Sequence, residues 1–159
     1  DHDFHAIAMP QIGPGKAARF ENHHRDVGRM RVTGKQEDAY KFRTPSLRNI
    51  SETGPYGHNG AYASLEAVIR HHLDPVAGLN NYDRSQAIFP KLPGANDWSI
   101  LDTPSEVEAI ARANELKPID LKDVEISQLI SFLKALKDDV SLYGRLGVPK
   151  SVPSGLPID

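Results

Sequence analysis

The sequence contains no cysteine among its 159 residues, and it has only two methionines and one tryptophan. No thiolate of this chain can therefore form a disulfide, bind zinc or attach a haem covalently. No apolar run approaches the length that spans a bilayer, so we expect no membrane span. The net charge is −2, and this lack of a basic excess argues against a nucleic-acid partner.

The composition indicates a globular domain that contains long ordered loops. Hydrophobic residues make up 39% of the chain and charged residues 25%, while glycine and proline each occur 12 times. No internal repeat, phosphate-binding loop or Ser-His-Asp arrangement points to another chemistry. We therefore expect one mainly α domain with long Pro/Gly-rich loops and little sheet.

Three helices are predicted from start signals and apolar spacing. Ser64 is a suitable N-cap for the first, and Thr103 followed by Pro104 begins the second. The third and strongest begins near residues 120–121, with Ile126, Leu129, Ile130 and Leu133 in helical register. Residues 76–102 read as a loop-rich insertion, and residues 143–159 read as an extended tail.

The first helix carries an unusual histidine. Leu65, Val68, Ile69 and His72 follow one another at i, i+3, i+4 and i+7, which places an imidazole on an apolar face. Two interpretations are open: a core histidine bonded to a carbonyl, or an axial ligand of a metal or haem iron. His71 is rotated by about 100° from His72, so both side chains cannot enter the same cavity.

The segment before this helix is rich in turns and also contains a histidine. It reads TGPYGHNG over residues 53–60, and its prolines and glycines constrain the backbone strongly. Such a loop is costly unless it holds something in place. His58 within it is either a turn residue that bonds the backbone or the wall of a binding pocket.

These motifs resemble those of a known family. The strings KFRTPSLRN (residues 41–49), TGPYGHNG (53–60) and SLE (64–66), with a D-x-G-R loop at residues 26–34, resemble the bacterial di-haem cytochrome c peroxidases. The superfamily of these enzymes includes the methylamine-utilisation di-haem enzymes. The resemblance covers about residues 26–75.

The resemblance implies a fold and a place in a longer protein. Residues 1–159 are expected to form the C-terminal, cytochrome c-like electron-transfer domain. Members of the family attach haem c through C-x-x-C-H motifs, and the second motif lies just before a segment like residues 1–5. We therefore expect the haem-attachment cysteines to lie upstream of this chain. A family member that has lost its haem is the alternative.

The function implied by the resemblance is periplasmic reduction of hydrogen peroxide to water. Electrons would come from a small donor, a cytochrome c or a cupredoxin, and pass through this domain to a peroxidatic haem in the N-terminal domain of the same protein. The resemblance also allows a homodimer, and this segment by itself would be inactive. The alternatives are a methylamine-utilisation-like enzyme that oxidises a protein substrate, or a haem-free interaction module.

The resemblance also implies ligands for two metal centres. The sixth haem ligand, Met in the peroxidases and Tyr in the methylamine-type enzymes, falls on His72, with His71 as the fallback. His58 would line the haem pocket without binding iron. A calcium ion would be held between the two haem domains, and the backbone carbonyls of Thr53 and Pro55 would help to bind it.

Two arginines complete the expected site. Arg43 and Arg48 either pair with the haem propionates or form ordinary ion pairs with Glu52 and Glu66.

Overall fold

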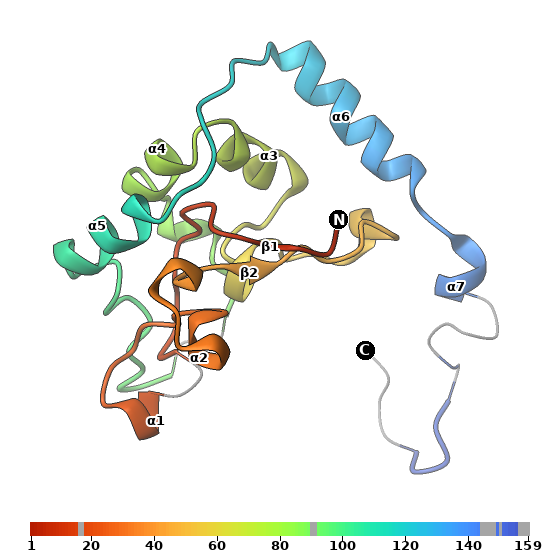
Figure 1. Cartoon of the computed structure of the whole chain (residues 1–159). Helices are drawn as coiled ribbons and strands as arrows, with labels where there is room; N and C mark the ends of the chain where they lie inside the picture. Colours follow the sequence, from red (N-terminus) through yellow and green to blue (C-terminus); the bar gives the residue numbers. More distant parts are fainter. Residues whose placement is uncertain (16–17, 90–91, 144–148, 150, 156–159) are drawn as a thin grey trace.

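The structure is a computed structural model that describes residues 1–159 except 16–17, 90–91, 144–148, 150 and 156–159. It is mostly helical with one small two-stranded sheet, in agreement with the predicted fold class (Figure 1). The strands are β1 (Phe4–His5) and β2 (Phe42–Arg43), and the α-helices are α1 (Ala18–Glu21), α2 (Met30–Thr33), α3 (Leu65–Leu73), α4 (Pro75–Asn80), α5 (Pro104–Arg112), α6 (Asp123–Ala135) and α7 (Asp139–Tyr143). Four short 3-10 helices lie between them: η1 (Gln36–Asp38), η2 (Ile50–Glu52), η3 (His58–Gly60) and η4 (Arg84–Gln86).

The N-terminal segment contributes much of the core. β1 pairs antiparallel with β2, so that Phe4 lies opposite Arg43 and His5 lies opposite Phe42. The residues that follow β1 are buried: Ala6, Ala8, Met9, Pro10, Gln11 and Ile12. The sequence predicts an extended segment here. It does not predict the burial of the segment, because its prolines and glycines are typical of exposed turns.

The larger core cluster joins this segment to helices from the middle of the chain. Ile110 in α5 has 1% of its surface exposed and packs with Ala8, Tyr40, Leu79 and Ile100. α4 and α5 lie against each other, and Leu79 is the residue that α4 contributes to this cluster. Burial of these apolar side chains is the main source of stability for this half of the molecule.

The predicted capping of α3 is confirmed, and a short helix that was not predicted follows it. The hydroxyl oxygen of Ser64 accepts a hydrogen bond of 3.2 Å from the amide of Ala67. The carboxylate of Asp74 caps α4 in the same way, accepting from the amide of Ala77 at 3.0 Å, and Pro75 occupies its first turn. Residues 75–80 are therefore helical rather than the start of a loop, although Gly78 lies within them.

Helix α6 runs along one side of the body, in contact with α3 at one end and with η2 at the other (Figure 1). It begins at Asp123, close to the predicted start. Of its predicted apolar stripe, Ile126 is fully buried, but Leu129 is 40% exposed, and the neighbouring Phe132 is 58% exposed. The predicted core face is therefore only partly covered by the described residues of this chain.

Two further observations concern the whole of the described chain. None of its helices combines the length and the apolar character that a membrane crossing requires. The tail predicted after Tyr143 lies largely outside the described residues.

Candidate functional site

The two histidines of α3 are exposed in the opposite order to the one predicted. His71 is 2% exposed, whereas His72 is exposed to solvent. By the 100° step of a helix, His72 still lies between Leu65 and Val68 around the axis. It sits in the last turn, however, where no described part of the chain covers it. The predicted burial of His72 in this chain is therefore wrong, while its predicted angular position on α3 agrees with the structure.

His71 is the core histidine, and both of its ring nitrogens are engaged. Nε2 lies 2.7 Å from the carbonyl oxygen of Ile7, and Nδ1 lies 2.8 Å from the hydroxyl of Tyr62. Burial lowers the pKa of His71 to about 4, so the imidazole is neutral near pH 7. These two bonds link α3 to the N-terminal segment and leave no nitrogen for iron, which disfavours the fallback assignment of His71 as the ligand.

His72, in contrast, presents a free nitrogen. Its Nδ1 lies 2.7 Å from the carbonyl oxygen of Val68. A carbonyl oxygen can only accept, so Nδ1 carries a proton, and in the neutral ring the lone pair is therefore on Nε2. No hydrogen bond from the described residues reaches Nε2. A histidine whose other nitrogen donates to a backbone carbonyl is the usual form of a metal-ligating imidazole.

Exposed apolar side chains occur on helix α6 and just before η2. α6, which contacts α3, exposes Leu129 and Phe132, and Leu47 before η2 is also exposed. The backbone of Asn49 donates to the carbonyl of Leu136 at 3.1 Å, which joins the end of α6 to the segment leading into η2. A haem takes an axial ligand and an apolar surround, and the described residues offer an imidazole with an unbonded Nε2 on α3 and an uncovered apolar face on α6, a helix that contacts α3.

The turn between η2 and η3 carries the two carbonyl oxygens that were predicted to bind calcium. Thr53 and Pro55 are both exposed, and no hydrogen bond from the described residues reaches either carbonyl oxygen. Just after this turn, the backbone pair between Tyr56 and Tyr62, at 2.7 and 2.9 Å, closes the loop that contains η3. Among the described residues, no group of three or more His, Cys, Asp or Glu side chains is placed to hold a metal.

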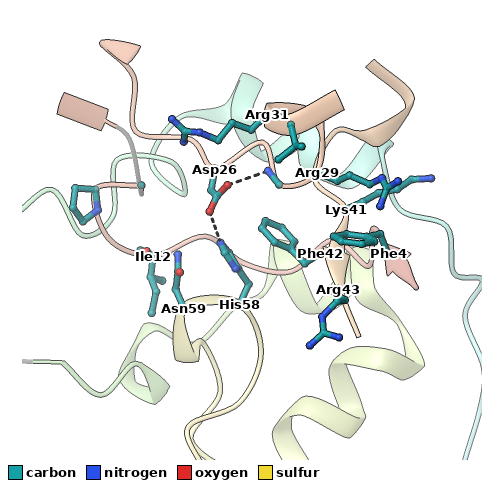
Figure 2. A pocket seen from close by; sticks show the side chains of 14 residues that line it. Phe4, Ile12, Asp26, Arg29, Arg31, Lys41, Phe42, Arg43, His58 and Asn59 are labelled. Atoms are coloured by element: carbon teal, nitrogen blue, oxygen red, sulfur yellow. Dashed lines mark hydrogen bonds and ion pairs between the residues drawn. The ribbon is translucent and has the colours of Figure 1, made fainter. Parts of the chain in front are cut away.

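His58 lines a pocket of about 590 Å³ together with an acidic partner (Figure 2). Its ring stacks on Phe42, with centroids 3.8 Å apart. Its Nε2 lies 3.3 Å from Oδ2 of Asp26, a polar contact whose geometry falls short of a well-aligned hydrogen bond. His58 is thus a pocket residue whose polar neighbour is a carboxylate rather than the backbone. That this pocket adjoins a haem remains a prediction.

Asp26 is held in place by backbone contacts. The side-chain amide of Gln11 pairs with the Asp26 backbone in both directions, at 2.7 and 2.9 Å, and Oδ1 of Asp26 accepts from the amide of Gly28 at 3.0 Å. The pKa of the Asp26 carboxyl lies below its usual range, chiefly because of His58. Burial acts in the opposite direction, and the hydrogen bond from the Gly28 amide lowers the pKa further.

The cations around this pocket are mostly paired. Arg31 bonds Glu21 at 2.8 Å and Lys41 bonds Glu115 at 2.7 Å, while Arg29 lies over the Phe4 ring at 4.4 Å. These pairs leave little net positive charge facing the cavity.

The two arginines expected near propionates lie in different settings. Arg43 lines the pocket of His58, whereas Arg48 pairs with Asp138. The alternative partners predicted for them are wrong. Glu66 instead pairs with Arg70 on the same helix, and Glu52 lies 3.8 Å from Lys137. Arg70 lies one helical turn from Glu66, so the helix already holds the two side chains close together. Arg43 and Arg48 belong to other segments and have no such advantage.

We expect Asp26→Asn to lower the free energy of unfolding by about 1–3 kcal/mol at neutral pH, because His58 would lose its partly buried, charged partner. The folded-state pKa of Asp26 lies below the unfolded value, so the stabilisation is full above about pH 4 and is lost as the pH falls through the folded value. Urea unfolding from pH 7 to pH 3 should show the gap between parent and variant narrowing in acid. The exposed Asp120→Asn serves as the control, and a gap that does not vary with pH would contradict this origin.

Several residues of the site escaped the sequence reasoning. Gln11, Asp26, Tyr62 and Gly78 all matter through contacts with residues distant in the chain. Two local signals were present: the D-x-G-R string that contains Asp26, and Tyr62, two residues before Ser64. Neither signal shows that Asp26 meets His58 or that Tyr62 meets His71.

No family model matches the chain. It is 32% identical over 117 residues to the cytochrome-c peroxidase IdrP1 of Denitromonas iodatirespirans, a match that covers 74% of this chain and 23% of that protein. It is 28% identical over 141 residues to the methylamine utilization protein MauG of Paracoccus denitrificans, which covers 86% of this chain and 34% of that protein.

A solved structure is similar as well. The crystal structure of a MauG-like protein associated with microbial copper homeostasis matches with a TM-score of 0.54 and 29% sequence identity, over 92% of this chain and 38% of that one. The chain thus spans roughly a quarter to two fifths of the length of these relatives. As its motifs predict, the chain belongs to the superfamily of di-haem cytochrome c peroxidases and MauG proteins.

Proposed function

We propose that this chain is the C-terminal, cytochrome c-like electron-transfer domain of a periplasmic di-haem peroxidase that reduces hydrogen peroxide to water. The observation that carries the proposal is the free Nε2 of His72, presented by α3 directly after the TGPYGHNG turn. The cytochrome c peroxidases among its relatives support the class of reaction.

Haem c, attached through cysteines upstream of Asp1, would supply the one-electron chemistry. His72 would bind the iron through Nε2, while its Nδ1–H bond to Val68 keeps the ring in the required tautomer and orientation. Leu129 and Phe132 on α6 would exclude water from the haem edge, and Arg43 and Arg48 would lie toward the propionates. An imidazole ligand in place of a thioether favours the ferric state and therefore a lower potential.

The proposed partners follow from this role. The N-terminal haem domain of the same protein would take electrons from this one, and a small cytochrome c or cupredoxin would supply them. The protein would act in the periplasm, and a homodimer is compatible with this arrangement.

A MauG-like activity, the oxidation of a protein substrate, is the second candidate. The observation that favours it is the match to MauG over 86% of this chain, together with the MauG-like solved structure. The ligand position is Met in the peroxidases and Tyr in the methylamine-type enzymes, whereas this chain has His72. The identity of the ligand therefore does not distinguish the peroxidase from the MauG-like function.

Steady-state turnover of the intact protein separates these candidates. With a reduced small cytochrome c or cupredoxin as donor, we expect peroxide-dependent oxidation of the donor. If peroxide is consumed only when a protein substrate is oxidised, the MauG-like function is correct and the peroxidase function is wrong.

Calcium removal should lower this turnover while leaving the haem attached. We propose that the carbonyls of Thr53 and Pro55 bind calcium at the junction with the N-terminal domain, so a strong chelator should loosen that junction. Added calcium should restore activity better than magnesium, which requires a stricter octahedral geometry. Thr53→Ala keeps the carbonyl and should retain the ion. An untreated protein that contains no calcium by elemental analysis would remove this site.

A further inference from the structure

Tyr62 differs from the other tyrosines in the chemistry of its hydroxyl partner. The hydroxyls of Tyr56 and Tyr82 donate to the carbonyl oxygens of Ile50 and Ala61, Tyr40 lies beside the guanidinium of Arg25, and Tyr143 is exposed beside Lys137. A carbonyl oxygen or a guanidinium cannot take up a phenolic proton at neutral pH. Of the five tyrosines, Tyr62 is the one whose hydroxyl bonds a basic nitrogen among the described residues, at 2.8 Å from Nδ1 of His71.

The hydrogen bonds fix which nitrogen of His71 is the base. Nε2 lies 2.7 Å from the carbonyl oxygen of Ile7, which can only accept. Nε2 therefore carries the proton of the neutral ring, and Nδ1 has the lone pair that accepts from Tyr62. Tyr62 is 4% exposed and His71 is 2% exposed, so water does not compete for this bond.

We propose that Tyr62 is a redox-active tyrosine and that His71 is its proton acceptor. A one-electron oxidant, an oxidised metal centre in the protein or a photogenerated ruthenium(III) complex in the test, removes one electron from the phenol. The phenolic proton moves along the hydrogen bond to Nδ1. The products are a neutral tyrosyl radical and an imidazolium whose Nε2–H still donates to Ile7, and the oxidant is reduced by one electron. Return of an electron sends the proton back.

The surroundings of Tyr62 suit a radical that is shielded from solvent and can exchange an electron with a neighbouring ring. Tyr82 lies edge-on to Tyr62, with ring centroids 5.5 Å apart, and Met9 belongs to the same buried cluster. The rings of His71 and His72 are 6.2 Å apart. The identity of the oxidant in the cell rests on the proposed function, whereas the proton-coupled chemistry of Tyr62 does not.

Gly78 provides a way to disturb the pair without altering either member. A Cβ added at Gly78 in α4 would lie 2.6 Å from Nδ1 of His71, which is closer than atoms can approach. Alanine is tolerated by the helical backbone at this position. Gly78→Ala should therefore displace the imidazole and lengthen the bond to Tyr62 while leaving the phenol in place.

The test is flash oxidation of the intact protein with tris(bipyridine)ruthenium and a sacrificial electron acceptor, followed by high-field electron paramagnetic resonance. We expect the spectrum of a hydrogen-bonded neutral tyrosyl radical, formed more slowly in heavy water. This signal should be lost in Tyr62→Phe and retained in Tyr56→Phe, whose hydroxyl faces a carbonyl. In Gly78→Ala it should form more slowly, with a g-tensor shifted toward that of a radical without a hydrogen bond.

Two results would overturn the proposal: the same radical yield in Tyr62→Phe, or a radical in Gly78→Ala with unchanged rate and spectrum. The second remains decisive if Tyr62→Phe does not fold. A parallel sample mixed with peroxide and frozen tests the physiological oxidant separately. A Tyr62 radical after the flash but not after peroxide would support the redox pair and count against the proposed peroxidase function.

Discussion

In the intact protein, His72→Ala should convert the haem proposed for this domain from a six-coordinate, low-spin centre to a five-coordinate, high-spin centre. The physical reason is that Nε2 of His72 is free among the described residues, while both nitrogens of His71 are committed to Ile7 and Tyr62. Peroxide turnover should fall by more than the roughly 10–100-fold that follows loss of an outer-shell partner. Optical and electron paramagnetic resonance spectra report the spin state directly.

Two companion variants make this result specific. His72→Met should remain six-coordinate with a raised potential, because a thioether favours the ferrous state more than imidazole does. His24→Ala removes a histidine distant in the sequence and should change neither spectrum nor turnover. If the haem stays low-spin and six-coordinate in His72→Ala with no replacement ligand, the assignment of His72 is wrong.

The largest effect on stability should come from Ile110→Ala. Ile110 is 1% exposed and lies where α5 meets the N-terminal segment and α4, in contact with Tyr40, Leu79 and Ile100. Truncation leaves a cavity that this rigid cluster cannot fill, so the free energy of unfolding should fall by about 2–5 kcal/mol. Urea unfolding followed by circular dichroism measures the change.

The matched control for this variant is Ile88→Ala. Ile88 is 71% exposed, so the same change of side chain removes little buried surface, and we expect its effect to be within about 0.5 kcal/mol. Equal losses in the two variants would show that the Ile110 cluster is not the core of the folded chain.

Local signals in the sequence were sufficient to place helices. The Ser64 cap and the Thr103–Pro104 start act through neighbouring residues, so the sequence displays them directly. Helix α4 was missed, although Asp74 and Pro75 form a regular start, because Gly78 so soon afterwards reads as a break. The structure explains that glycine by the space that it leaves for His71.

The burial of individual site residues could not be predicted, because it depends on contacts across long stretches of chain. His71 is buried against Ile7, which lies 64 residues earlier, and His58 meets Asp26 from a separate loop. Helical periodicity placed His72 on the apolar face correctly. It could not show that the described chain stops covering that face in the last turn of α3.

Membership of the superfamily was predicted from motifs in turns rather than from the helices. The strings around Thr44–Asn49 and Thr53–Gly60 lie in loops, where prolines and glycines constrain the backbone. The matches to the peroxidase and to MauG confirm this prediction. Composition and periodicity by themselves indicate no more than a mainly helical globular domain.

The most direct test of the account is the optical spectrum of the intact protein, produced with the machinery that attaches haem c. We predict a Soret band, together with the sharp α and β bands of a low-spin c-type haem on reduction, and loss of the low-spin component in His72→Ala. A folded, intact protein with no Soret band would contradict the haem-domain assignment and leave the haem-free interaction module as the correct description.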